Sequence, residues 1–480
     1  MIADLKPYPE YKESGLPWLG QVPGHWEVRR TKTILQEVDR RSSTGSEPLL
    51  SLRMRSGLVD HHALGGKLIP PWALVGYKHV LPGEIVMNRM RAAAGLFAAA
   101  TSEGLVSPDY ALFRPACLMN VAYAVQLFRT PAMTSVFRLE SRGLGTGESG
   151  FLRLYSDRFG TLPVPFPPLG EQAAILRFLD WANGRLDRAI RAKRKVIALL
   201  TEQKQAIIHR AVTRGLDPSV PLKPSGIPWL GDIPQHWELI SLRMRYSVEL
   251  GKMLDAKRIT GRHSMAYLRN RDVQWDRIVV DDLPTMDIPP GEFARYTLQR
   301  GDLLVCEGGQ VGRSAFWHDQ LPICAFQKAL HRVRSLDTNR DYPRFFFYQM
   351  QLAAGRGVFS ADGNENTIAH LTCEKLRRHR FAFPPFAEQK AVADRLDGAL
   401  KQFQTTTSRL EREIELLREY RLRLVADVVT GKLDVRAVAA GLPEQAVESE
   451  ALDGAAALAD GTEETDDRDD LDEIAEEVEV

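Results

Sequence analysis

The chain has 480 residues, of which 44% are hydrophobic and 26% are charged, values ordinary for a folded globular protein. This length is sufficient for about two to four domains with substantial cores. No apolar run approaches the roughly 18 residues that a membrane-spanning helix needs, and the first residues lack the apolar core of a signal peptide. The four cysteines are scattered without a C-x-x-C pair, which favours a cytoplasmic location and argues against a zinc site.

The net charge of +1 hides a strong asymmetry along the chain. Between Glu444 and Val480 there are 16 acidic residues and one arginine, which leaves residues 1–443 with a net charge of +16. A basic body favours a polyanion partner such as nucleic acid, with a merely solvated basic surface as the alternative. The acidic end is predicted to be a disordered tail.

A proline- and glycine-rich arm occurs twice. The first copy is Ser14-Gly-Leu-Pro-Trp-Leu-Gly-Gln-Val-Pro-Gly-His-Trp-Glu27, and Ser225-Gly-Ile-Pro-Trp-Leu-Gly-Asp-Ile-Pro-Gln-His-Trp-Glu238 repeats it 211 residues later. Such a density of proline and glycine excludes a regular helix, so each copy is predicted to be an irregular arm. Four tryptophans are expected to anchor the arms on globular domains, with base stacking as the alternative: Trp18, Trp26, Trp229 and Trp237.

Each arm leads into a segment that predicts mixed α and β structure with short strands. Pro82–Met87 and Arg300–Val305 are matching turns that feed strands, and Leu52–Arg55 matches Leu268–Arg271 in the same way. The similarity is clear in this framework and fades between these points. We infer two domains of common ancestry that have diverged from each other.

Each domain segment is followed by a long helical pattern that begins with F-P-P-x-x-E-Q. Matched positions in Phe166–Thr213 and Phe383–Thr430 differ by 217 without any insertion. Apolar residues recur at steps of three, four or seven, which is typical of a coiled coil. The predicted seam comprises Ile175, Leu179, Leu186, Ile197, Leu200 and Ile207 in the first helix and Val392, Leu396, Phe403, Ile414, Leu417 and Leu424 in the second. Gly215 and Gly431 are predicted to end the helices.

The short connection between the helices favours an antiparallel arrangement. It could span roughly 75 Å only when fully extended, whereas two parallel helices would require it to return along about 65 Å of helix. The predicted fold class is therefore α+β, with two mixed α/β domains separated by a long antiparallel two-helix coiled coil in a pseudo-two-fold internal repeat. The predicted boundaries are 1–165 for the first arm and domain, 166–213 for the first long helix, 214–235 for the linker and second arm, 236–382 for the second domain, 383–435 for the second long helix and 436–480 for the acidic tail.

No constellation in the sequence points to catalysis or to a metal site in this chain. Asp255-Ala-Lys257 resembles the end of a nuclease motif but lacks the further carboxylates that would hold a metal ion. The glycine-rich stretch 143–150 is followed by Phe151 where a P-loop would have lysine. His61 and His62 have no partners at ligand spacing and are interpreted as surface residues.

Side chains that can pair with base edges occur beside the predicted strand ends. Arginine suits guanine in the major groove, and asparagine or glutamine suits adenine. For any one of them, a phosphate contact or an ordinary surface role is the alternative. The candidate DNA-binding residues are Arg53, Arg55, Arg89 and Arg91 in the first domain and Arg269, Arg271, Gln310, Arg313, Gln327 and Lys328 in the second.

With these features assembled, residues 1–435 resemble the specificity subunits of type I restriction-modification enzymes. The resemblance rests on the doubled arm, the doubled F-P-P-x-x-E-Q start of a long helix, the turn Gly301-Asp-Leu-Leu-Val-Cys-Glu-Gly-Gly309 and the closing Val429-Thr-Gly-Lys-Leu433. It implies two target-recognition domains, each reading one half of a split, asymmetric site in double-stranded DNA, with the helices setting the gap. The acidic tail is not part of that pattern.

The resemblance also implies that the chain is not itself an enzyme and binds no cofactor. Its expected partners are two modification (methyltransferase) subunits, which restriction (translocase and nuclease) subunits can join. S-adenosylmethionine, ATP and Mg²⁺ would be bound by those partners. The alternatives are an autonomous DNA nuclease or methyltransferase, and a structural coiled-coil adaptor without DNA specificity.

Overall fold

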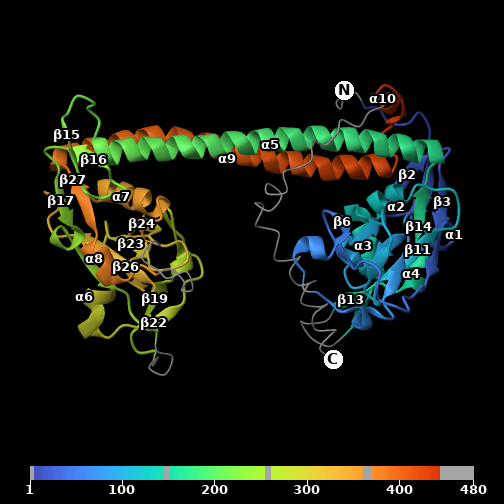
Figure 1. The fold of residues 1–480 in the computed structure, drawn as a ribbon, viewed down its shortest axis with the longest axis horizontal. Coiled ribbons are helices and arrows are strands. Elements are labelled where there is room, and N and C mark those ends of the chain that lie inside the picture. Colours follow the sequence, from blue (N-terminus) through green and yellow to red (C-terminus); the bar gives the residue numbers. More distant parts are fainter. Residues whose placement is uncertain (1–4, 67, 145–150, 255–260, 360–369, 444–480) are drawn as a thin grey trace. The chain divides into compact units, whose positions relative to one another are not determined.

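The computed structural model describes residues 5–66, 68–144, 151–254, 261–359 and 370–443 (Figure 1). These residues form both helices and strands, which confirms the predicted α+β character. The chain divides into two compact units: unit 1 contains Met1–Ala192 and Arg412–Val480, and unit 2 contains Lys193–Glu411. Unit 1 is therefore discontinuous, because its N-terminal and C-terminal parts pack together.

The strands of unit 1 are short and pair mainly in antiparallel fashion. They are β1 (Tyr11–Leu16), β2 (Gly20–Pro23), β3 (Glu27–Arg30), β4 (Leu35–Val38), β5 (Leu50–Arg53), β6 (Gly57–Asp60), β7 (Lys78–Val80), β8 (Ile85–Met87), β9 (Phe97–Ala99), β10 (Gly104–Val106), β11 (Ala111–Pro115), β12 (Arg142–Leu144), β13 (Phe151–Arg153) and β14 (Pro163–Phe166). Its shorter helices are α1 (Thr31–Ile34), α2 (Val121–Phe128), α3 (Pro131–Glu140), α4 (Ser156–Thr161) and α10 (Arg436–Ala440).

The central sheet of unit 1 has the strand order β4-β11-β8-β9. Side chains alternate between its two faces along each strand, as the pleat requires. Ile85 and Met87 belong to the core shared with α2, α3 and α4, whereas Val86 faces a second cluster with Leu52 and Ala98. The β5–β6 hairpin is thereby packed on one face of the sheet and the helices on the other.

Unit 2 repeats this arrangement with its own set of short elements. Its strands are β15 (Leu222–Pro224), β16 (Asp232–Pro234), β17 (Glu238–Ser241), β18 (Tyr246–Leu250), β19 (Ser264–Leu268), β20 (Val273–Gln274), β21 (Arg277–Ile278), β22 (Thr285–Asp287), β23 (Leu303–Cys306), β24 (Ser314–Phe316), β25 (Ala325–Phe326), β26 (Leu330–Ser335) and β27 (Arg380–Phe383). Its shorter helices are α6 (Phe293–Tyr296), α7 (Pro343–Gly355) and α8 (Cys373–Arg378).

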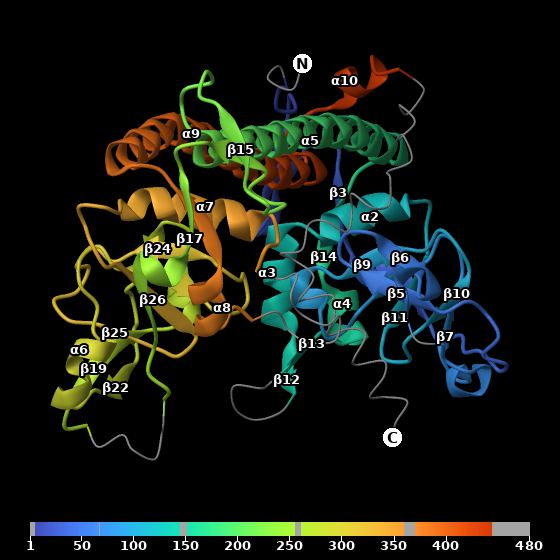
Figure 2. The same ribbon diagram turned by 60° about the vertical axis from the view of Figure 1, so that its left-hand side comes forward.

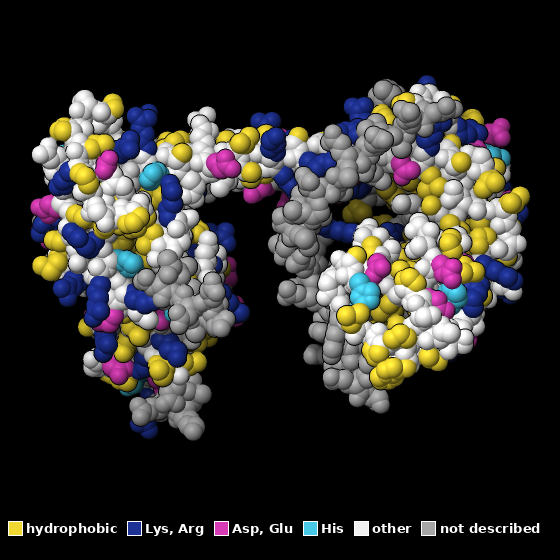
Figure 3. Space-filling model, viewed as in Figure 1, with side chains coloured by type: hydrophobic (Ala, Val, Ile, Leu, Met, Phe, Trp, Pro, Cys, Tyr) yellow, Lys and Arg dark blue, Asp and Glu magenta, His cyan; other side chains and the backbone are white. Residues whose placement is uncertain are grey.

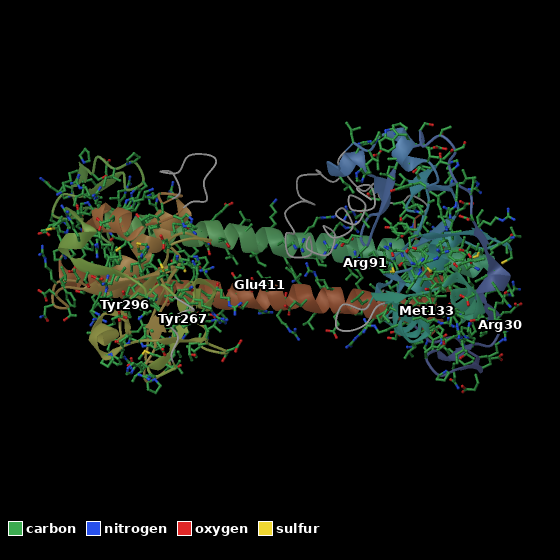
Figure 4. The ribbon with its side chains drawn as sticks, turned by 90° about the horizontal axis from the view of Figure 1, so that it is seen from below. Arg30, Arg91, Met133, Tyr267, Tyr296 and Glu411 are labelled. Carbon is green, nitrogen blue, oxygen red and sulfur yellow. The ribbon has the colours of Figure 1, made fainter. Side chains whose placement is uncertain are left out.

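The central sheet of unit 2 has the order β18-β26-β23-β24, which matches that of unit 1 strand for strand. Its Leu303 and Val305 face α7, which lies between the sheet and the long helices in Figures 1 and 2. Leu304 faces a second cluster that contains Leu268 of β19. A small outer cluster includes Tyr267, and Tyr296 packs against it (Figure 4 labels both residues).

A buried carboxylate paired with an arginine supports the turn before the third strand of each sheet, although Arg40 follows β4 and Arg334 lies in β26. Glu84 pairs with Arg40 at 3.1 Å, and Asp302 pairs with Arg334 at 2.5 Å. Each carboxylate also accepts the backbone N–H three residues before it, at 2.8 and 2.7 Å respectively. A shared framework of this kind accounts for the local sequence match between the two domains.

The long helices are α5 (Leu169–Arg214) and α9 (Phe386–Val429). Each begins three residues later than predicted, because the phenylalanine pairs in β14 or β27 and a residue that precedes a proline disfavours the helical conformation. The second helix was also predicted to reach residue 435, which is wrong. It ends at Val429, because Gly431 turns the backbone with a φ of 79°. Gly215 ends α5 in the same way, with a φ of 71°.

Within each unit, one end of α5 packs against the opposite end of α9. In unit 1 the core joins Leu179 to Leu424 and Val428, and in unit 2 it joins Ile208 to Val392. The predicted seam residues that are buried are Ile175, Leu179, Leu186, Val392, Leu396, Ile414 and Leu424, and those that are half-buried are Ile197, Leu200, Ile207, Phe403 and Leu417. Across the described ranges, no helix is both long and apolar enough to cross a membrane.

The arms are more regular than predicted. β1 pairs with β2, and β15 pairs with β16, so each arm contains a short antiparallel hairpin. Proline and glycine exclude a helix from these segments, but they are compatible with a twisted edge hairpin with a bulge. The first hairpin contains such an irregularity between Glu13 and Leu16.

Candidate nucleic-acid interface

Loops from several strands of unit 2 meet at one edge of its sheets. β19 and β25 run parallel, with Leu268 opposite Phe326, so the residues that follow both strands emerge at the same edge. The turn after β23 joins them there, because the Glu307 N–H donates to the Ala329 carbonyl at 3.0 Å. Lys252, which follows β18, donates its N–H to the Phe326 carbonyl at 3.0 Å. We call residues 269–271, 307–313 and 327–328 the reading edge of unit 2.

Two of the predicted arginines hold this edge together from within. Arg269 donates to both carboxylate oxygens of Asp272, at 2.9 Å each. Arg313 donates to the Asn270 backbone carbonyl at 3.0 Å and to its Oδ1 at 2.9 Å. The Asn270 amide in turn donates to the Gly308 carbonyl at 3.0 Å. These side chains fix the shape of the loops.

Other predicted residues of this edge are more exposed to solvent. The Arg271 side chain is 71% exposed and lies 3.9 Å from Asp272. Gln310 and Lys328 are exposed, and Gln327 is half-buried. Donors of this kind on a preorganised edge can reach base edges or phosphates.

The corresponding edge of unit 1 is built around the turn after β8. Buried Asn88 shapes the turn, because its Oδ1 accepts the N–H groups of Met90 and Arg91 at 2.9 and 3.1 Å. Arg89 faces inward and donates to Glu37 at 2.8 Å and to the Asp109 carbonyl at 3.3 Å. Arg89 is thus a structural tie, whereas Arg91 is half-buried at the surface of unit 1 (Figure 4).

The remaining candidates of unit 1 lie on the β5–β6 hairpin. Arg53 is 6% exposed at the end of β5, and Arg55 is exposed in the turn. His61 was interpreted as a surface residue, which is wrong: it is buried, with its Nδ1 3.1 Å from the Ser51 hydroxyl. His62 is exposed, as predicted.

In each unit, a glutamate in the first turn of the long helix contacts the histidine and tryptophan of the arm, and we call this set of three residues the clasp. The Trp26 indole N–H donates to Glu171 Oε2 at 2.6 Å, and His25 Nε2 lies 2.6 Å from Oε1 of the same carboxylate. In unit 2, the Trp237 indole donates to Glu388 at 3.1 Å, and its neighbour His236 lies 2.7 Å from that carboxylate. Both tryptophans are buried, so they serve as anchors, as expected.

The glutamine after each clasp glutamate is also fully buried and paired. Gln172 donates to the Pro167 carbonyl at 2.8 Å and accepts the Asn120 N–H at 2.7 Å. Gln389 donates to the Pro384 carbonyl at 2.9 Å and accepts the Tyr342 N–H at 2.9 Å. Sequence reasoning recognised the E-Q motif without assigning its role. The signal that could have revealed it is the joint recurrence of H-W in the arm and E-Q in the helix.

The unit 1 clasp has two additional partners from the ends of the chain. Arg436 of α10 donates to Glu171 at 3.1 Å, and the Tyr8 hydroxyl lies 3.4 Å from the same carboxylate. Burial, together with the charge of Glu171, raises the pKa of Tyr8 well above its usual range. The Asp434 N–H donates to the Lys6 carbonyl at 2.8 Å, so the first and last described segments of the chain contact each other in unit 1.

Among the residues that the structure describes, no three His, Cys, Asp or Glu side chains form a group that could hold a metal ion. The nuclease-like residues Asp255 and Lys257 lie outside the described residues, as do residues 145–150 of the glycine-rich stretch. The interface therefore offers hydrogen-bond donors and positive charge on a rigid scaffold.

Comparison with known proteins finds similar sequences and a similar fold. No protein-family model matches the sequence. The chain is 23% identical over 442 residues to the putative type I restriction enzyme MjaX specificity subunit of Methanocaldococcus jannaschii, covering 87% of this chain and 96% of that protein. It is 34% identical over 103 residues to the type I restriction enzyme EcoBI specificity subunit of Escherichia coli, covering 21% of this chain and 22% of that protein.

A solved structure shares the fold over most of the chain. It comes from work described as the structural basis of complex assembly and conformational transition of the type I R-M system. The TM-score is 0.65 at 13% identity, and the match covers 86% of this chain and 99% of that one. The chain is therefore similar in sequence to specificity subunits of type I restriction enzymes, and similar in fold to this solved structure.

Proposed function

We propose that this chain is the DNA sequence-specificity subunit of a type I restriction-modification complex. It reads a bipartite, asymmetric DNA site and directs partner methyltransferase and restriction subunits to it. The observation that carries the proposal is a matched framework with unmatched edges. Both units have the same sheet order and a carboxylate paired with an arginine in the turn before the third strand, but they present different side chains beyond that strand.

The difference between the edges supports an asymmetric target. Unit 1 presents Arg91 and the nearby hairpin residue Arg55, whereas unit 2 presents Arg271, Gln310 and Lys328. Arginine and glutamine donors favour different bases in the major groove. We therefore infer that the two units read different half-sites, so that the complete DNA site is not a palindrome.

The long helices are the proposed spacer between the half-sites. α5 has 46 residues and α9 has 44, so each helix is about 65 to 70 Å long at 1.5 Å per residue. We infer that they form one antiparallel coiled coil, with the two target-recognition domains related by an approximate two-fold axis. Its length limits the separation of the domains to about two turns of DNA.

Partner subunits are proposed to carry the chemistry. Methyl transfer and ATP-driven restriction would use S-adenosylmethionine, ATP and Mg²⁺ bound by those partners. Leu199 of α5 and Leu416 and Leu422 of α9 are 54%, 47% and 59% exposed, and we propose them as contact positions for those partners.

Binding and activity assays on the chain alone and with its methyltransferase partner test the proposal. The complex is expected to protect one bipartite DNA sequence, whereas the chain alone is expected to show neither cleavage nor methyl transfer. Robust activity without a partner would identify an autonomous enzyme. A complex that binds all DNA sequences equally would identify an adaptor, and either result would reject the proposal.

A further inference from the structure

A basic groove lies between the second arm and α8, and none of its lining residues belongs to the reading edge of unit 2. Lys and Arg side chains are spread over the face of unit 2 on which α8 lies (Figure 3). The groove encloses a cavity of about 410 Å³, and no carboxylate is among the side chains that line it. These are Ile227 and Trp229 from the arm, Lys375 and Arg378 from α8, and His379 and Arg380 at the start of β27.

The positive charges of this groove are accessible. Arg378 and Arg380 are exposed, and Lys375 is half-buried. Within the described part of the chain, the side chains of Lys375 and Arg378 make no ion pair, and Arg380 makes only a long hydrogen bond of 3.5 Å to the Leu239 carbonyl. Arg377 differs, because it donates to the Val248 carbonyl at 3.1 Å and pairs with Glu374 at 2.9 Å. One arginine of α8 is thus structural, and its neighbours are available for a ligand.

The shared framework keeps a cation at the position of Lys375, where unit 1 has Arg158, but it does not require the other two charges. The positions of unit 1 that match Arg378, His379 and Arg380 hold Thr161, Leu162 and Pro163, at the same offset of 217 as the long helices. Both sets connect a one-turn helix to the strand that leads into a long helix. The basic groove is therefore an addition to the common fold of the two domains.

The shape and composition of the groove suit a nucleic-acid backbone. Guanidinium and ammonium groups bind phosphate oxygens through charge-assisted hydrogen bonds. The Trp229 ring packs edge-on against Phe381, with centroids 5.8 Å apart, and remains half-buried, so one side of the groove is an aromatic wall. An aromatic wall beside cations can accommodate the apolar face of a sugar while the phosphates meet the charges.

We propose that this groove binds the sugar–phosphate backbone of DNA flanking the second half-site. This inference rests on the proposed function, because it assumes that unit 2 is bound to DNA. Contacts of this kind carry affinity without sequence information. The two domains consequently differ in their electrostatic contribution to the DNA-binding free energy, which is larger for unit 2 than for unit 1.

Salt-dependent binding of the full chain in complex with its methyltransferase partner tests this inference. The variant K375A/R378A/R380A is compared with wild type on DNA with and without the target site. The slope of log Kd against log salt is expected to fall by about 2 to 3, at roughly 0.9 per lost phosphate contact. The ratio of specific to nonspecific affinity is expected to stay the same. The matched control R158A in unit 1, at the position equivalent to Lys375, is expected to change the slope by no more than about 1.

Three results would overturn the inference. An unchanged salt slope in the triple variant would show that the groove does not contact phosphates. A variant that loses its methyltransferase partner but keeps its salt slope would make the groove a protein-docking site. A changed base preference with an unchanged slope would assign the groove to sequence reading. If the wild-type complex itself shows no sequence preference, the proposed function fails as well, and that outcome is visible without any variant.

Discussion

The clasp around Glu171 gives the most specific stability prediction. Glu171→Ala removes the acceptor of the buried Trp26 indole and the partner of His25 and Arg436. A buried donor that loses its acceptor costs about 1–3 kcal/mol, and a hydrogen bond to a charged group contributes about 1.5–3 kcal/mol. Because these partners share one carboxylate, their contributions do not add, and we expect a total loss of about 3 kcal/mol.

Hydrogen exchange of the intact chain is the appropriate assay, because it reports each clasp separately. A loss of about 3 kcal/mol corresponds to roughly 100-fold faster exchange in a peptide covering residues 8–26. Glu388→Ala, whose carboxylate has the Trp237 and His236 contacts but is 28% exposed, is expected to cost about 2 kcal/mol, seen in residues 219–237. Glu13→Ala, in the exposed arm, serves as the control. The reasoning is refuted if Glu171→Ala accelerates exchange less than tenfold, or no more than Glu13→Ala does.

Four further predictions follow from the reading edge, a buried histidine, the helices and the tail. Arg271→Ala is expected to relax base preference at one position of the second half-site by about 1–3 kcal/mol in competition binding; uniform weakening on all sequences would make Arg271 a phosphate contact instead. Burial lowers the pKa of His331, so its contribution to the stability of unit 2 is present above the ordinary pKa of 6.5 and is lost as the pH falls below that value. In unfolding experiments between pH 7.5 and 5.5, His331→Asn is expected to lose less stability than the wild type. Equal pH dependence of stability in both proteins would contradict this prediction. Deletion of both residues 193–199 and residues 410–416 removes about 10 Å from each long helix and should shorten the gap between the recognised half-sites by about three base pairs. Deletion from one helix alone should impair assembly. An unchanged gap after the matched deletion would show that the helices are not the spacer. Removal of residues 444–480 should tighten nonspecific DNA binding at low salt, because the tail opposes the charge of the basic body; equal binding with and without the tail would dismiss this role.

The repeated framework was predictable from the sequence because it depends on local patterns. The constant offset of 217 identified both long helices, and Gly215 and Gly431 marked their last turns, although the predicted boundary at residue 435 lay beyond Gly431. The exact first turn was less predictable, since the phenylalanine of each F-P-P motif belongs to β14 or β27 rather than to the helix. Strand pairing with β3 and β17, which come from distant parts of the sequence, takes these residues out of the helix.

The site was less accessible to sequence reasoning because the role of an arginine depends on its tertiary neighbours. Asp272, three residues from Arg269, was a local sign that this arginine is paired within the chain. No such sign exists for Arg89, whose partner Glu37 lies 52 residues earlier. The candidates that remain outward-facing, such as Arg271 and Gln310, stay predicted DNA contacts.

Sequencing of DNA modified by the assembled complex is the most direct test of the central claim. It should be done with the wild-type chain and with a chain whose second domain, residues 239–382, is replaced by that of a related subunit. We predict methylated adenines in two different half-sites at a constant separation, and an exchange that alters only one half while the separation stays fixed. A single continuous site, a palindrome, or an exchange that alters both halves would contradict two independent reading domains held on one pair of helices.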